Sequence, residues 1–139
     1  MKEITRVGAY AVIEKAEQVL LCQLTRSRMW TLPGGGLEFG EEPLHALHRE
    51  VHEETGLEIE NPRLIGVNSN TAEREDRLHM IQIVYRANAI HEELTAELEG
   101  TTDACAWCPW DEVIEMNITP SVKFAIKELA IKQRTARSS

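Results

Sequence analysis

Three glutamates, Glu50, Glu53 and Glu54, stand at the i, i+3 and i+4 spacing of one helix face. At about 100° per residue, Glu53 and Glu54 fall near 300° and 40° when Glu50 is placed at zero, so the three carboxylates point one way. Like charges at these spacings repel one another and destabilise a helix. The pattern therefore predicts a cation beside this face, and clustered carboxylate oxygens suit a hard divalent ion such as Mg²⁺.

A glycine-rich segment and an arginine accompany these acids. The run Gly34–Gly36 allows the backbone to approach an ion closely or to adopt positive φ, and a carbonyl of this loop could be a further ligand. Arg49 can hold Glu41 or Glu50 through a bidentate pair, which would keep the acids in place. Glycines, acids and arginine together predict a phosphate-handling metal site.

The helix that must carry the acids has clear ends. Pro43 suits a first helical position because its missing N–H would be unpaired there, and Gly56 suits the position just after the helix. We therefore expect a helix over residues 43–55. Its apolar stripe, predicted as Leu44, Leu47 and Val51, should pack on the rest of the protein.

Residues 35–57 carry the spacing G-x5-E-x7-R-E-U-x-E-E-x-G-U, in which U is a bulky aliphatic residue. This segment resembles the Nudix box at every constrained position, and residues 30–35 resemble the usual lead-in of that family. The resemblance implies an α/β fold, namely the Nudix-type α/β/α sandwich with a mixed β-sheet, and a single domain over residues 1–139. It also implies hydrolysis of nucleoside diphosphates linked to another moiety, with Mg²⁺ or Mn²⁺ as cofactor.

The resemblance further assigns roles to the acids. Glu50, Glu53, Glu54 and the Gly34 carbonyl are the implied metal ligands, and Glu53 would serve a second ion or its water shell. Glu50, or an acid outside the box, would act as the base. We therefore expect Glu50, Glu53 and Arg49 to be the catalytic residues.

Supporting residues surround this set. Glu41 and Gly35 should support the metal site, and Arg26 and Arg28, which precede the glycine run, could contact the phosphates of the substrate. Asp103 could be the acid outside the box. The alternatives for that acid are Glu97, Glu99, Glu73 and Glu75.

Hydrophobic periodicity predicts the elements around the site. Strands are expected over 5–14, 18–25, 58–67, 78–89 and 105–110, with a short strand at Leu37 and Phe39 and a C-terminal helix over 120–132. Residues 68–77 and 91–103 are polar and are expected to be loops. Residues 132–139 are expected to be a frayed tail.

Composition excludes several classes of protein. A length of 139 residues, 42% of them hydrophobic, suits one compact domain. A net charge of −8 argues against an extended nucleic-acid footprint, although bound cations can still attract a polyanionic substrate. No apolar run approaches a membrane span and no signal peptide is evident, so we expect a cytoplasmic protein. The family frequently forms homodimers, and the sequence leaves the oligomeric state open.

The three cysteines, Cys22, Cys105 and Cys108, do not suggest a disulfide framework. Cys105 and Cys108 have the C-x-x-C spacing, but neither a second metal-binding pair nor a helix start accompanies them. We therefore expect reduced, buried or half-buried thiols.

The predicted function is a Mg²⁺-dependent hydrolase that cleaves a diphosphate linkage in nucleoside diphosphate or triphosphate derivatives. Nucleoside triphosphates are favoured, and the expected partners are a small-molecule nucleotide substrate and a possible second copy of the chain in a homodimer. Alternatives within the enzyme class are ADP-ribose or nucleotide-sugar pyrophosphatase, or a hydrolase of dinucleoside polyphosphates or capped RNA ends. A different class is a non-catalytic nucleotide-binding regulatory module, which would often lack box acids that are all present here.

Overall fold

The computed structural model describes the backbone of residues 1–95 and 102–138, and the side chains of residues 1–95 and 104–130. Its elements, in chain order, are β1 (Glu3–Lys15), β2 (Gln18–Leu24), β3 (Trp30–Thr31), β4 (Gly34–Gly36), α1 (Pro43–Thr55), β5 (Ile59–Glu73), β6 (Arg77–Ala89), β7 (Thr102–Pro109), α2 (Trp110–Val113) and α3 (Pro120–Ser138).

The described strands form one mixed sheet. Its main order is β3-β2-β1-β6-β5, with β4 paired to β1 and β7 paired to β2. Strands β1 and β6 run parallel, and every other pair is antiparallel. On one edge of β1, residues 8–10 pair with β4 and residues 14–15 pair with β2, so the glycine run is an integral part of the sheet.

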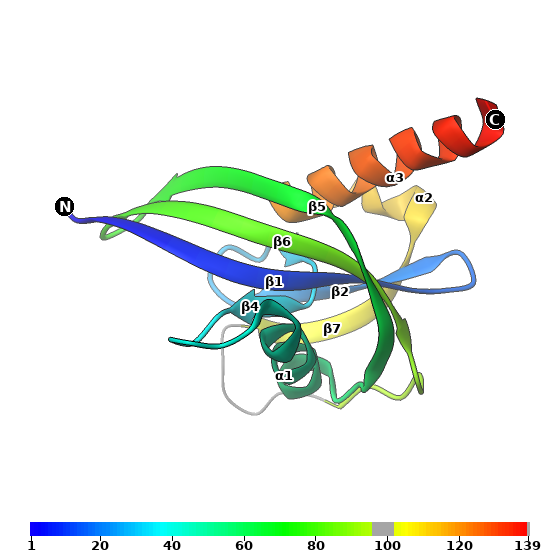
Figure 1. The fold of residues 1–139 in the computed structure, drawn as a ribbon, viewed down its shortest axis with the longest axis horizontal. Coiled ribbons are helices and arrows are strands. Elements are labelled where there is room, and N and C mark those ends of the chain that lie inside the picture. Colours follow the sequence, from blue (N-terminus) through cyan, green and yellow to red (C-terminus); the bar gives the residue numbers. More distant parts are fainter. Residues whose placement is uncertain (96–101, 139) are drawn as a thin grey trace.

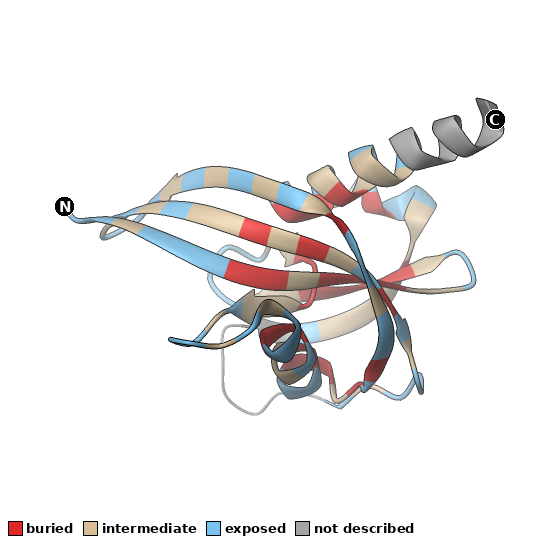
Figure 2. Cartoon of the chain, in the orientation of Figure 1, coloured by how far each residue is buried: buried red, intermediate tan, exposed pale blue. Residues whose placement is uncertain are grey.

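Helices α1 and α3 lie on opposite sides of this sheet (Figure 1). Alternation along β1 sends successive side chains to the two faces. One cluster, on the α1 side, contains Ala9, Ala11, Ile13, Leu47 and Val51. The other, on the α3 side, contains Val12, Val84, Val122 and Ala125. The buried stretches of β1 and β6 lie between the helices, whereas the N-terminal end of β1 is exposed (Figure 2). This arrangement confirms the predicted α/β/α class.

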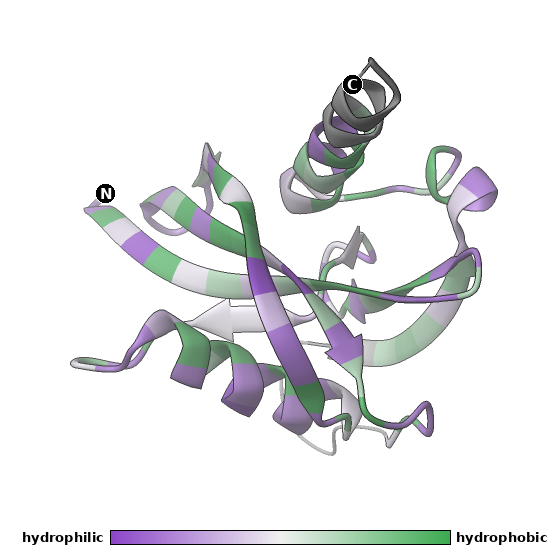
Figure 3. Ribbon diagram, turned by 45° about the vertical axis from the view of Figure 1, so that its right-hand side comes forward, coloured by the Kyte–Doolittle hydropathy of each residue, from purple (hydrophilic) through white to green (hydrophobic). Residues whose placement is uncertain are grey.

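Helix α1 has the predicted bounds. Pro43 begins it, and Gly56 follows it with a φ of 78° and donates its N–H to the carbonyl of His52 at 2.8 Å. The outer side of the helix is largely hydrophilic (Figure 3). The expected burial of Leu44 is wrong, because that residue is 44% exposed. The buried face centres on Ala46, Leu47 and Glu54, and Leu44 lies at its margin.

Two predictions about strands are wrong. The short strand lies at Gly34–Gly36 and not at Leu37 and Phe39, and Phe39 is fully exposed. The glycines pair with Gly8, Ala9 and Tyr10, a long-range contact that local hydrophobicity cannot reveal.

Residues 68–77, expected to be a loop, instead belong mostly to a long hairpin. Strand β5 continues to Glu73 and β6 begins at Arg77, so only residues 74–76 form the turn. The polar side chains of Asn68 and Asn70 fit a strand because they bond Gln82 on β6. The pairing partner thus overrides the weak strand propensity of this segment.

The C-terminal helix is longer than predicted. Helix α3 extends to Ser138, whereas the sequence indicates a frayed tail from residue 132. Within the described part of the chain, no helix is both long and apolar enough to cross a membrane.

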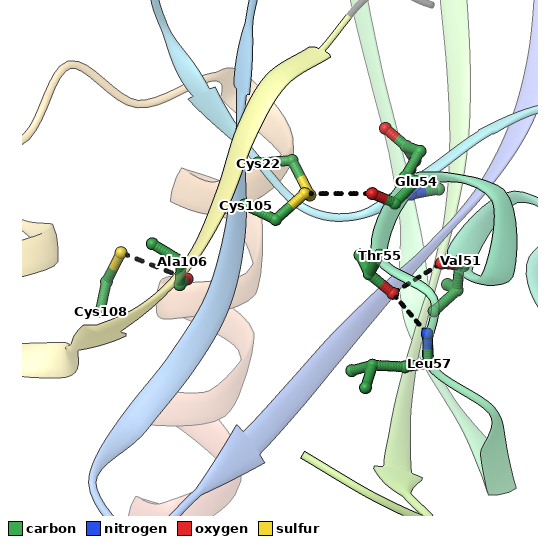
Figure 4. Close-up of a disulfide and its surroundings, with 9 residues drawn as sticks. Cys22, Val51, Glu54, Thr55, Leu57, Cys105, Ala106 and Cys108 are labelled. Atoms are coloured by element: carbon green, nitrogen blue, oxygen red, sulfur yellow. Dashed lines mark hydrogen bonds between the residues drawn. A yellow bond between two sulfur atoms is a disulfide. The ribbon is translucent and has the colours of Figure 1, made fainter. Parts of the chain in front are cut away.

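The prediction of reduced cysteines is wrong for two of the three. Cys22 on β2 and Cys105 on β7 are directly opposite in the antiparallel pair, with Cα atoms 4.0 Å apart, and they form a disulfide (Figure 4). Cys108 is the buried free thiol of the chain, and burial raises its pKa, with the charge of Glu112 adding to the effect. The register that brings Cys22 and Cys105 together depends on a strand pairing 83 residues apart in sequence.

This disulfide predicts one reactive thiol, from Cys108, when the protein is unfolded without reductant, and three after reduction. Because the bridge closes a loop of 83 residues, its reduction should lower the free energy of unfolding by about 4 kcal/mol. Thiol counting in denaturant and urea unfolding with and without reductant measure both quantities. Three thiols without reductant would contradict the bridge.

Candidate active site

Helix α1 and strand β4 bring the predicted acids to the glycine run. Glu54 is 6% exposed, and its Oε1 accepts the N–H of Gly34 at 2.7 Å. Glu50 is half-buried and Glu53 is exposed. The three carboxylates therefore share one side of the helix but differ in their access to water.

Arg49 contacts three acids of this cluster. Its Nε and Nη2 donate to the two carboxylate oxygens of Glu41, each at 2.8 Å, and its Nη1 donates to Glu50 Oε1 at 2.8 Å. Glu53 Oε2 lies 3.5 Å from the same Nη1. Nη2 also donates to the carbonyl of Gly36 at 3.2 Å. The expected bracing of Glu41 and Glu50 by Arg49 is present for both acids.

These contacts shift the ionisation of both partners. The hydrogen bonds from Arg49 hold the pKa of Glu41 well below its usual range, and the backbone N–H of Glu38 adds to this. Conversely, the bond to Glu41 raises the pKa of Arg49 above its usual range. Both shifts favour the charged forms of Glu41 and Arg49.

Two positions of β4 favour glycine, because a Cβ there would collide with neighbouring atoms. Gly34 has a φ of 144°, and a Cβ there would lie 2.2 Å from the carbonyl oxygen of Ala9. A Cβ on Gly35 would lie 2.6 Å from Cδ and Oε2 of Glu50. The backbone of Gly35 therefore lies directly against a predicted catalytic carboxylate.

The predicted ligands fit a divalent cation by their donor chemistry. Carboxylate oxygens gathered near a backbone segment suit hard ions such as Mg²⁺ or Mn²⁺. Among the described residues, no three acidic, histidine or cysteine side chains are already arranged as a metal cage. Glu41, Glu50 and Glu53 instead converge on Arg49, whose single positive charge offsets only part of their negative charge.

Tyr10 is a site residue that sequence reasoning missed. It pairs with Gly34 across β1 and β4. Burial, followed by the negative charge of Glu54 and then of Glu50, raises the pKa of Tyr10 to about 12, and a hydrogen bond with Gln82 acts in the opposite direction. The phenol therefore stays protonated beside the acids. Nothing in the local sequence separates it from other strand residues.

Comparison with known proteins identifies the family. The NUDIX domain model matches residues 3–128. The chain belongs to the NUDIX family. It is similar to a MutT NUDIX hydrolase from Burkholderia pseudomallei (26% identity, TM-score 0.80), covering 90% of this chain and 98% of that one. It is also similar to a mutator MutT protein from Bacillus halodurans (30% identity, TM-score 0.70; 88% and 80% covered). An ADP-ribose pyrophosphatase from Streptococcus suis shares the fold (20% identity, TM-score 0.68; 95% and 92% covered).

Membership of this family confirms the predicted enzyme class, a Nudix pyrophosphohydrolase. The Nudix box accounts for the cluster described above, since Glu41, Arg49 and the helix acids all belong to it. The Gly34 carbonyl remains a predicted ligand, and the structure adds that the N–H of this residue is already bonded to Glu54.

The predicted residues outside the Nudix box stay predictions. Arg26 and Arg28 lie exposed in the turn between β2 and β3. Asp103 belongs to β7, but its side chain lies outside the described residues, as do Glu97 and Glu99. Strand β7 does pass the end of α1, because the sulfur of Cys105 lies 3.5 Å from the carbonyl oxygen of Glu54 (Figure 4).

The remaining alternatives for the outside acid, Glu73 and Glu75, lie at the far turn of the β5–β6 hairpin. Both are exposed, and Glu73 forms an ion pair with Arg77 at 3.5 Å. Their surroundings suit a solvated hairpin end.

Proposed function

We propose that this chain is a Mg²⁺-dependent hydrolase of nucleoside triphosphates that releases pyrophosphate, with Mn²⁺ as a substitute ion. The observation that carries this proposal is the Arg49-centred cluster, in which Glu41, Glu50 and Glu53 gather beside the buried Glu54 and the glycine run. Family membership supports the pyrophosphohydrolase class.

In this proposal Glu50, Glu53, Glu54 and the Gly34 carbonyl hold the cation. When bound, such an ion neutralises phosphate oxygens and lowers the pKa of an attacking water. The protein groups hold these donors in position. Gly34 N–H orients the Glu54 carboxylate at 2.7 Å, and Arg49 orients Glu50 at 2.8 Å.

Proton transfer is assigned to Glu50. Water attacks a phosphorus of the diphosphate bridge, the bond to the leaving phosphate oxygen breaks, and the Glu50 carboxylate accepts the proton of the water. Arg49 orients Glu50 through a hydrogen bond at 2.8 Å, and Glu41 in turn holds Arg49 through two hydrogen bonds. Asp103 is the alternative base outside the box. Arg26 and Arg28 are proposed to contact the substrate phosphates.

Hydrolysis of ADP-ribose or nucleotide sugars is the second candidate. The fold shared with the ADP-ribose pyrophosphatase of Streptococcus suis supports it, although at 20% identity the likeness concerns the fold alone. We propose further that residues 1–139 act as one domain and that the enzyme works in the cytoplasm.

A substrate panel tests the proposal. With Mg²⁺, nucleoside triphosphates should yield the monophosphate and pyrophosphate, and excess chelator should abolish the reaction. The panel should include ADP-ribose, nucleotide sugars and dinucleoside polyphosphates, with products separated by ion-exchange chromatography. Faster cleavage of ADP-ribose would select the second candidate. Absence of metal-dependent turnover on every compound would refute a hydrolase of nucleotides.

A further inference from the structure

Three side-chain amides form a cluster on the sheet face that carries α3. Asn68 and Asn70 on β5 each donate Nδ2 to the same atom, Oε1 of Gln82 on β6, at 2.9 Å. Gln82 is 7% exposed, and both asparagines are half-buried. We call these three residues the amide cluster.

The hydrogen bonds within the amide cluster leave some of its donors and acceptors available to a ligand. A side-chain amide has two N–H donors and an oxygen with two lone pairs. Each asparagine therefore retains one N–H and its Oδ1. Among the described residues, none donates to the Oδ1 of Asn68 or Asn70. Both asparagines thus present a donor beside an acceptor, held in orientation by Gln82.

The strand register places the amide cluster on the same cross-sheet row as the glycine run. Gly36 pairs with Gly8, Gly8 pairs with Gln82, and Gln82 pairs with Asn68. At about 4.8 Å per strand, Gln82 lies about 10 Å and Asn68 about 14 Å across the sheet from Gly36. This span is comparable with the length of a nucleoside.

Tyr10 joins the two regions. It pairs with Gly34, whose N–H donates to Glu54. The ring of Tyr10 lies over Gly8, where a Cβ would come within 2.7 Å of it, and Gly8 pairs with Gln82. Strands β4, β1 and β6 therefore connect Glu54 to the amide cluster through neighbouring residues.

An aromatic residue and an arginine flank the amide cluster. The ring of Phe124 on α3 lies against Gly66, where a Cβ would come within 2.9 Å of it, and Gly66 is two residues before Asn68 on the same face. On the other side, Arg6 and Asn70 both pair with Met80. The cluster thus has an aromatic ring at one end, and Arg6 lies two strands from Asn70 in the row at the other end.

We propose that the amide cluster reads the base of the nucleotide and selects purines over pyrimidines. This inference rests on the proposed function, because the acids must hold the diphosphate of the same molecule. Amide side chains pair with N6 and N7 of adenine, and arginine pairs with O6 and N7 of guanine, whereas cytosine is usually read by an acid. Asn68, Asn70 and Arg6 match the purine partners.

The test is a comparison of nucleoside 5′-monophosphate binding without metal, measured by isothermal titration or NMR shifts. The unaltered protein should bind AMP or GMP about tenfold more tightly than CMP and UMP, since each amide–base pair discriminates by about that factor. The double variant Asn68→Ala/Asn70→Ala should lose this preference. Thr71→Ala is the matched control, because Thr71 is exposed on the opposite face of β5 and should leave the preference unchanged.

Two results would overturn the inference: equal binding of purines and pyrimidines by the unaltered protein, or an unchanged preference in the double variant. If the double variant does not fold by circular dichroism, Asn70→Ser provides the same comparison with a smaller loss of contacts. Because binding is measured without metal, the inference is separable from the proposed function. A protein that prefers purines but cleaves no nucleotide would retain the amide cluster assignment and refute the hydrolase.

Discussion

Replacing Glu54 by glutamine is expected to lower metal-dependent turnover at least about 100-fold, because outer partners of metal sites alone cost about 10- to 100-fold and this residue is a proposed ligand. The fold should persist, since the amide oxygen of glutamine can still accept the Gly34 N–H that Glu54 accepts at 2.7 Å. Initial rates at several Mg²⁺ concentrations and a thermal unfolding curve measure the two effects.

Glu42→Gln is the matched control for this substitution. It makes the same chemical change one residue before α1, where the exposed side chain makes no capping hydrogen bond. Its turnover should stay within about twofold of the unaltered enzyme, as surface substitutions usually have small effects. Equal turnover of Glu54→Gln and Glu42→Gln at saturating Mg²⁺ would remove Glu54 from the site.

Gly35→Ala is expected to lower kcat about 100-fold with little loss of stability. The new Cβ would lie 2.6 Å from Cδ and Oε2 of Glu50, so the carboxylate must move. Displacement of a catalytic group by about 1 Å can cost about 100-fold in rate. Because the obstructing atoms are the end of a flexible side chain, the melting temperature should change little.

Gly36→Ala provides the comparison within the same strand. The nearest atom to a Cβ at Gly36 is the Val7 carbonyl oxygen at 3.9 Å, which is an ordinary contact. Steady-state kinetics of the two alanine variants, with circular dichroism on both, separate a displaced carboxylate from a damaged strand. Similar activity of the two variants would show that Glu50 does not need its place against Gly35.

The local sequence was sufficient to predict helix α1 and the contacts of Arg49 with Glu41 and Glu50. Pro43 and Gly56 define the helix ends through their backbone properties, which do not depend on distant residues. Arg49 lies eight residues after Glu41 and one before Glu50, so a single helix with its preceding loop brings them together. These are short-range relations, and the structure reproduces them.

The β5–β6 hairpin shows why other parts could not be predicted. Asn68 and Asn70 suggest a loop by composition, yet each bonds Gln82 on the next strand, and that bond makes a polar residue favourable on a sheet. The same limit applies to Tyr10, whose importance follows from a pairing with Gly34, and to Cys22, whose partner lies 83 residues away. Each depends on the register of paired strands.

By itself, the sequence determined the family of this protein and the local arrangement behind its proposed chemistry: which acids lie on one helix face and which arginine contacts them. That information is carried by spacing along a single helix and loop, where neighbours in sequence are neighbours in space. Only the tertiary structure decided how far the sheet extends, that Cys22 bonds Cys105 and that the amide cluster shares a sheet row with the glycine run. Strand register is set by contacts between distant segments, so no local pattern contains it.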